Sequence, residues 1–220
     1  KSRNNYVIKS YSTNWSKIVM QNRNVLKLFP QPLIHYKFED YKEQNIALEK
    51  YIKNLYEKNS DGLQRSNIDG WHSPDFSLKE KDTAAYKFFI SLRKYLIDVF
   101  KILGWRYDPN KIIMTNMWAI INKKNNFNLP HIHPNCYLSA AYYVKTHDGC
   151  GKIKFTNPNL ASRQRSPLIE NKTDFNQNGI EVDPKEGDLL FFPAYLTHEV
   201  LRNNSDKERI VISFNIDIAK

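Results

Sequence analysis

Residues 129–144 read LPHIHPNCYLSAAYYV and join two histidines to an apolar run that is typical of a buried strand. Pro134 favours an extended backbone at the residue before it, so His131 and His133 would project from the same face of a strand. Neutral imidazole is a common protein ligand for iron, zinc and copper. This stretch therefore predicts two ligands of a metal site.

A third histidine, His198, lies in GDLLFFPAYLTHEV, a second strand-like apolar run that ends in polar residues. Three of the six histidines of the chain thus lie in these two strand-like stretches. The competing interpretation is that two histidines on a strand merely pack or form hydrogen bonds. The accompanying His198 and Arg209 favour metal binding by all three histidines.

Arg209 opens the sequence RIVISFNI, in which every second residue shares one face of a predicted strand. That face carries Arg209, Val211, Ser213 and Asn215, and the isoleucines point the other way. An arginine with an inward-facing hydroxyl four residues further on suits a bidentate grip on a small carboxylate. We therefore expect a carboxylate clamp beside the metal site.

Taken in order, these motifs resemble the catalytic core of the iron(II)- and 2-oxoglutarate-dependent oxygenases, closest to their prolyl-hydroxylase-like branch. The motifs are HIHPN followed by YYV, then GKIKF, GDLLFF, HEV and RIVISFN. LFPQPLI near residue 30 and RSNIDGWHS at residues 65–73 also resemble a group of uncharacterised putative oxygenases of bacteria and phages. The resemblance covers most of the chain.

The resemblance implies that Fe(II) is held by His131, His133 and His198. The family usually has a carboxylate at the position of His133, so an imidazole there leaves the iron site one unit more positive. A second register stays open, in which His133 and Asn135 form the pair and the amide supplies an oxygen ligand.

The resemblance also implies that Arg209 binds the distal carboxylate of 2-oxoglutarate, with Ser213 as its hydroxyl partner and Tyr143 adding a hydrogen bond. The implied activity is that of a 2-oxoglutarate-dependent dioxygenase that uses O2 and hydroxylates an unidentified substrate, such as a protein side chain or an anionic molecule.

Two other functions stay open. A three-histidine cupin-type dioxygenase would work without 2-oxoglutarate and would not need Arg209 and Ser213 facing inward. A non-enzymatic jelly-roll binding module would use its metal structurally or not at all.

Apolar residues recur at helical spacing over residues 39–59 and again from a cap at Asp82 or Thr83 to Gly104. After residue 104 short strands take over, preceded by one edge strand in residues 29–38. The later strands are expected at residues 111–121, 136–145, 151–156, 187–193, 197–202 and 209–217.

The resemblance implies a mainly β fold, a double-stranded β-helix (jelly roll) with the N-terminal helices packed on one sheet. We expect a single domain over residues 1–220. Its N-terminal arm and helices would occupy residues 1–105, and its catalytic core residues 106–220.

Three further residues are candidates for the substrate side of the site: Trp118, Asn122 and Asn215. Packing is an equally good explanation for Trp118. We place His72 outside the site, because a loop histidine beside a tryptophan more often packs or forms hydrogen bonds. Residues 157–185 form a polar segment without evident structure, whose arginines at 163 and 165 could meet an anionic substrate.

A formal net charge of +10 is spread over scattered lysines, and no arginine-rich run or stacking motif focuses it. We attribute this charge to composition and do not expect nucleic-acid binding, whereas an anionic partner stays open. Two cysteines are too few for a disulfide scaffold. No apolar run approaches membrane-spanning length, so we expect a protein of the cytoplasm, or of the host cytoplasm if a phage encodes it.

Overall fold

The computed structural model describes residues 23–106, 108–159, 161 and 164–219. The chain separates into two compact units, residues 1–31 and residues 32–220, and the helices and strands described below belong to the second unit. Most of the expected N-terminal arm, residues 1–22, lies outside the described residues. None of the helices in the described part of the chain is long and apolar enough to span a membrane.

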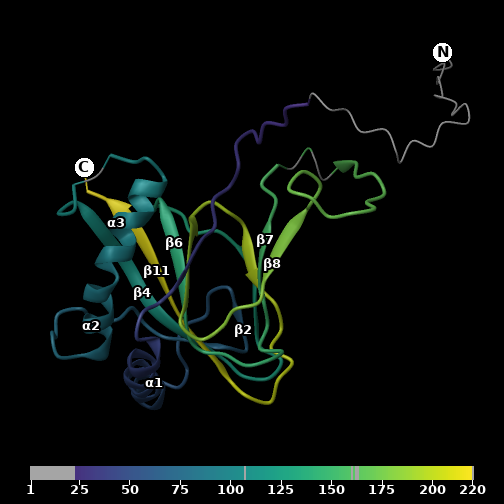
Figure 1. The fold of residues 1–220 in the computed structure, drawn as a ribbon. Coiled ribbons are helices and arrows are strands. Elements are labelled where there is room, and N and C mark those ends of the chain that lie inside the picture. The colour runs from purple at the N-terminus through teal and green to yellow at the C-terminus, as the bar shows by residue number, and fades with distance from the viewer. Residues whose placement is uncertain (1–22, 107, 160, 162–163, 220) are drawn as a thin grey trace, which may run out of the picture. The chain divides into compact units, whose positions relative to one another are not determined.

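Two antiparallel sheets make up the second unit (Figure 1). The larger sheet has six strands, which lie in the order β1 (Ile34–Lys37), β9 (Asp188–Pro193), β6 (Leu138–Lys145), β11 (Arg209–Ile218), β4 (Ile112–Asn122) and β3 (Trp71–His72). The smaller sheet has five strands, in the order β2 (Asn67–Ile68), β5 (Phe127–His131), β10 (His198–Val200), β7 (Ile153–Thr156) and β8 (Gly179–Val182). Neighbours in the sheets are mostly distant in sequence, so the architecture depends on long-range pairing.

Alternating residues of the central strands divide the interior into two cores, because successive side chains of a strand point to opposite faces. In β6, Tyr142 and Val144 join the core that the larger sheet shares with the helices. Ala141 and Tyr143 join the smaller core between the two sheets. The inner face of the larger sheet is therefore the face that meets the smaller sheet.

Three helices cover the outer face of the larger sheet: α1 (Tyr41–Lys58), α2 (Ala84–Ser91) and α3 (Arg93–Ile102) (Figure 1). The side chain of Asn45 on α1 is buried and connects the helix to β6. Its amide donates to the carbonyl of Val144 at 2.7 Å and its Oδ1 accepts from the hydroxyl of Tyr142 at 2.5 Å. The helices thus support the strands whose opposite face lines the site.

The expected single helix from residue 83 to residue 104 is divided at Leu92. Thr83 caps its start, accepting a hydrogen bond from the backbone N–H of Tyr86 at 3.2 Å. The Ser91 hydroxyl donates to the carbonyl of Phe88 at 2.6 Å and competes with the backbone bond of Leu92 to the same oxygen. The N–H of Leu92 is consequently shared between two carbonyls, and the helix is irregular there.

Three short strands were not expected from the sequence: β2, β3 and β8. The strand expected to carry both His131 and His133 is β5, which ends at His131, so the expectation that His133 lies in it is wrong. The expectation that residues 157–185 are without structure is wrong at β8, which pairs with β7 at the edge of the smaller sheet. β8 has only four residues and a mixed polar sequence, so its pairing depends on β7 rather than on its own pattern.

Candidate active site

A cavity of about 520 Å³ opens between the two sheets. Its walls come from the inner faces of β4, β6 and β11, from the strands of the smaller sheet, and from the segment around β2 and β3. The three candidate histidines, Arg209, Tyr143, Ser213 and Trp118 all line it. The fold therefore gathers residues from both sheets in one cavity.

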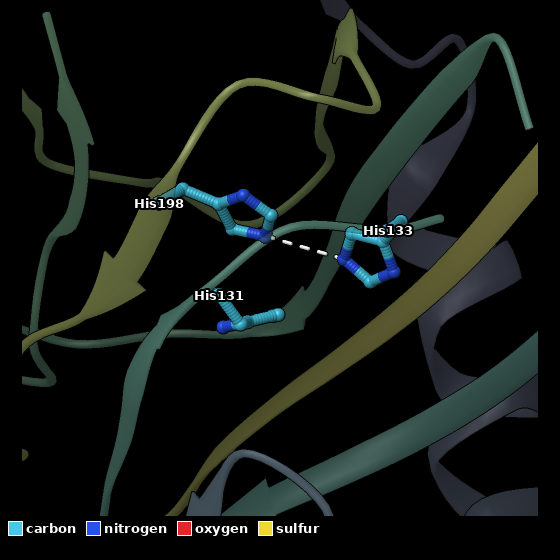
Figure 2. A group of neighbouring side chains, drawn as sticks. All are labelled: His131, His133 and His198. Atoms are coloured by element: carbon cyan, nitrogen blue, oxygen red, sulfur yellow. Dashed lines mark hydrogen bonds between the residues drawn. The ribbon is translucent and has the colours of Figure 1, made fainter. Parts of the chain in front are cut away.

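Strand pairing brings two of the histidines together. His131 ends β5 and His198 begins β10, and the two are direct partners in the antiparallel register. His133 lies two residues beyond β5, where its backbone N–H donates to the carbonyl of Ala194 at 2.9 Å. The three side chains converge, each offering one ligand atom within 4.8 Å of the others (Figure 2).

The hydrogen bonds of two imidazoles fix which nitrogen of each ring keeps its lone pair. The Nδ1 of His131 lies 2.6 Å from the carbonyl oxygen of Leu129, and the Nδ1 of His198 lies 2.9 Å from that of Leu196. A carbonyl accepts only, so Nδ1 carries the proton and Nε2 keeps its lone pair, which in His131 lies 3.5 Å from the hydroxyl of Ser66 and in His198 lies 3.3 Å from the Nε2 of His133. The orientation suits a metal ligand, whose second nitrogen usually donates to such a group.

Burial keeps these imidazoles neutral, which is the form that binds metal. It lowers the pKa of His198 to about 3, helped by repulsion from His131 and His133. It lowers the pKa of His133 to about 4, helped by repulsion from His131 and His72. The Nε2 atoms of His133 and His198 lie 3.3 Å apart, a separation that suits two nitrogens each ~2.1 Å from one ion.

Asn135, the ligand of the alternative register, is placed differently. It is exposed, has a φ of 62° and does not line the cavity. The structure thus groups His133 with His131 and His198, and leaves Asn135 in the turn that follows.

Arg209 is 2% exposed and lies on the inner face of β11, two residues before Val211 and four before Ser213. One Nη1 donates to the carbonyl of Gly151 at 3.0 Å and to that of Cys150 at 3.4 Å. The Nε has no hydrogen-bond partner among the described residues. A buried guanidinium with an unsatisfied N–H is a candidate site for an anion.

Tyr143 on the neighbouring strand β6 is fully buried, and burial raises the pKa of its hydroxyl, while the charge of Arg209 opposes that rise. The phenol is therefore neutral and able to donate a hydrogen bond. Within the described part of the chain, the cavity lining includes two guanidinium groups, Arg65 and Arg209, and one carboxylate, Asp75. The balance of charge in the cavity favours an anionic ligand.

Of the three candidates for the substrate side, only Trp118 lines the cavity. The amide of Asn122 donates to Asn128 at 3.2 Å beneath the cavity wall. Asn215 pairs with Asn116 on β4 and Ser139 on β6, and its side-chain oxygen accepts from the hydroxyl of Ser139 at 2.9 Å.

His72, which the sequence did not place in the site, lines the cavity and is buried. Its ring stacks on that of Trp118, with centroids 5.5 Å apart and planes 9° apart. Its neighbours Arg65, Ser66 and Asp75 also line the cavity, so the segment around β2 and β3 forms one of its walls. The signal that could have located this wall is the motif RSNIDGWHS at residues 65–73, which carried part of the resemblance.

Arg165 is exposed and does not line the cavity, and the arginine at position 163 lies outside the described residues.

Comparison with known proteins agrees with this site. Residues 116–215 match the family described as "Putative 2OG-Fe(II) oxygenase". That range contains all three histidines, Tyr143, Arg209 and Ser213. A sequence search of curated proteins finds no match.

Several solved structures share the fold at low sequence identity. A prolyl-4-hydroxylase from Pseudomonas putida matches with a TM-score of 0.61 and 11% identity, over 86% of this chain and 94% of that chain. HygX from Streptomyces hygroscopicus, solved with nickel and 2-oxoglutarate bound, matches with a TM-score of 0.59 and 12% identity, over 86% and 83% of the two chains.

A prolyl hydroxylase from Trichoplax adhaerens, solved in complex with a peptide fragment of hypoxia inducible factor, gives a TM-score of 0.58 and 16% identity, over 84% and 83% of the two chains. These likenesses, together with the two antiparallel sheets, confirm the expected double-stranded β-helix.

Proposed function

We propose that this chain is a 2OG-Fe(II) oxygenase, the family whose model matches residues 116–215, and that it binds Fe(II) through His131, His133 and His198. Three neutral imidazoles that converge in a cavity suit a divalent transition metal and leave other coordination positions open to small ligands. The observation that carries the proposal is this convergence in the same cavity as a buried arginine.

We further propose that Arg209, Ser213 and Tyr143 bind the distal carboxylate of 2-oxoglutarate. Arg209 supplies positive charge and an unsatisfied N–H, and its bonds to the carbonyls of Cys150 and Gly151 hold the guanidinium in place. Because burial reduces screening by water, the guanidinium attracts a carboxylate more strongly here than it would at the surface. No glutamate or aspartate of the described chain lines this end of the cavity, so no acidic side chain competes for Arg209.

When bound, ferrous iron and 2-oxoglutarate supply the oxidising chemistry, in which O2 and 2-oxoglutarate give succinate and CO2 while one oxygen atom enters a C–H bond of the substrate. The protein supplies orientation and a cavity with a buried end. The carbonyls of Leu129 and Leu196 hold the Nε2 atoms of two histidines toward the common point. Hydroxylation of an unidentified substrate, reached from the exposed end of the cavity, is the proposed outcome.

The proposal is tested by loading the protein anaerobically with ferrous iron and 2-oxoglutarate, then admitting air. We expect the weak visible charge-transfer band of a chelated 2-oxo acid, followed by slow release of succinate. Succinate formation without the main substrate avoids the need to know that substrate. His198→Ala is the matched negative control, because it removes one ligand nitrogen from the cluster.

Two outcomes would overturn the proposal. Iron binding without the band or succinate would favour a three-histidine dioxygenase that does not use 2-oxoglutarate. Failure to bind ferrous iron under reducing conditions would favour the non-enzymatic binding module.

A further inference from the structure

The three histidines are held in two different ways. His131 and His198 each direct Nδ1 at the carbonyl of the residue two positions earlier, at 2.6 Å and 2.9 Å. Within the described part of the chain, the Nδ1 of His133 has no hydrogen bond of this kind. A hydrogen bond to the second nitrogen fixes the ring orientation of a ligand histidine, so His133 needs another restraint.

Besides the rings of His131 and His198, whose centroids each lie 5.1 Å from that of His133, an aromatic ring from outside the histidine cluster flanks His133. The ring of Trp118 lies 5.7 Å from that of His133, centroid to centroid, with 33° between the planes. Trp118 also stacks nearly parallel on His72 at 5.5 Å. The ring of Trp118 thus neighbours two imidazoles, that of His133 and the buried one of His72.

Hydrogen bonds fix the far side of this stack. The Nδ1 of His72 lies 2.7 Å from the carbonyl oxygen of Ser73. The backbone N–H of Ser73 donates to the carbonyl of Ala119 at 2.9 Å, and the hydroxyl of Ser73 accepts from the N–H of Ala119 at 2.9 Å. Ala119 follows Trp118 in β4, so the backbone that carries His72 is tied to the strand that carries Trp118.

Hydrogen bonding does not explain a tryptophan at this position. Trp118 is 8% exposed, and its indole N–H has no partner among the described residues. A buried N–H without an acceptor destabilises the folded state. The contacts of the side chain with the two imidazoles are made by its flat ring.

We propose that Trp118, backed by His72, is a positioning residue that orients His133 for metal binding in place of a hydrogen bond to its Nδ1. The proposal rests on the proposed function, because it takes the three histidines as metal ligands. Contact with the ring restricts rotation of the His133 imidazole before the metal arrives, so less side-chain freedom is lost when the metal binds.

The test measures Co(II) affinity by calorimetry and the visible absorption of the Co(II) protein, neither of which requires turnover. Trp118→Leu removes the flat ring, and we expect it to weaken Co(II) binding by about tenfold, the lower end of the loss typical when a ligand loses its outer partner. Trp118→Phe keeps a ring and removes the unsatisfied N–H, so we expect affinity within about threefold of the parent, given the usual size of aromatic contacts. His72→Leu should give a loss between the two.

Repeating the Trp118→Leu substitution in the His133→Asp variant separates a positioning role of Trp118 from general damage to the fold. In His133→Asp the carboxylate has no ring to pack on Trp118, so adding Trp118→Leu should change Co(II) affinity little. Thermal unfolding of each metal-free variant measures any loss of folding, and an equal loss of affinity in both backgrounds would show that Trp118 does not act through His133. Unchanged affinity in Trp118→Leu alone would also overturn the proposal.

Metal binding by the parent protein distinguishes failure of the proposal for Trp118 from failure of the proposed function. If the parent does not bind Co(II) or Fe(II), the metal site itself is rejected. If the parent binds and Trp118→Leu binds equally well, only the role of Trp118 is rejected.

Discussion

The buried and exposed ends of the cavity are built by different means. At the buried end, Tyr143 and Arg209 project from neighbouring strands of the larger sheet and are almost fully buried. At the exposed end, Arg65, Asp75 and Asn116 are exposed, and the first two lie in the irregular segment around β2 and β3. The buried end is positioned by strand register, and the exposed end by loops.

This difference matches two separate tasks. A small ligand of constant shape, such as a dicarboxylate, is best bound by groups that paired strands hold rigidly. A wall made of loop residues can vary without disturbing the sheets, which suits selection among substrates. We therefore expect substitutions at the centre and the buried end to affect metal and 2-oxoglutarate, and substitutions at the exposed end to affect the main substrate alone.

The largest effect is expected for a substitution in the histidine cluster, at the centre of the cavity. His198→Ala should lower Fe(II) affinity by more than about 100-fold, because losing a ligand costs more than losing an outer partner of one. His147→Ala is the matched control, since His147 bonds to the carbonyl of Lys207 and does not line the cavity. Anaerobic calorimetry measures both, and equal affinities would mean that the cluster does not bind metal.

Arg209→Met should weaken 2-oxoglutarate binding on the order of 100-fold, because hydrogen bonds to charged groups contribute more than neutral ones. Fe(II) affinity should be retained, because the hydrogen bonds that orient the histidines do not involve Arg209. Arg165→Met changes an exposed arginine outside the cavity and serves as control. Unaltered 2-oxoglutarate affinity in Arg209→Met would favour an oxygenase that does not use this co-substrate.

His133→Asp should keep or improve Fe(II) binding, because a carboxylate is the usual residue of the family at that position and offsets charge on the ion. Asn135→Gly should leave Fe(II) affinity unchanged, and glycine adopts the φ of 62° without strain. Metal titrations of both variants decide the register. Loss of metal in both would assign the site to His133 and Asn135.

Ser213→Ala should weaken 2-oxoglutarate binding about three- to tenfold, the effect of one net hydrogen bond. The residue lies on the inner face of β11 beside Trp118 on β4 and Ala141 on β6, so its removal leaves the fold intact. Titration of the charge-transfer band measures the affinity. A loss as large as that of Arg209→Met would mean that the hydroxyl does more than assist the guanidinium.

The smallest effect is expected at the exposed end. Asp75→Asn should keep the hydrogen bond with Asn116 and change uncoupled succinate formation by less than about twofold, as surface substitutions usually do. The rate of succinate release under the assay of the proposed function measures it. A large decrease would show that the exposed end also supports the binding of 2-oxoglutarate, and the distinction between the two ends would fail.

The sequence by itself determined the buried end of the cavity. Alternation along RIVISFNI assigned Arg209 and Ser213 to one face and the isoleucines to the other, because the side-chain period of a strand is a local property of the backbone. The helix start at Thr83 was likewise predictable, since a cap involves neighbouring residues.

Only the tertiary structure decided how these parts meet. His131 and His198 become partners through the register of β5 and β10, and His133 is held by a hydrogen bond to Ala194. The hydrogen bond between Ser139 and Asn215 and the approach of His72 to Trp118 likewise depend on segments that are distant in sequence. Such pairings have no local signal, because their free energy comes from long-range hydrogen bonds and packing that exist only after the sheets have formed.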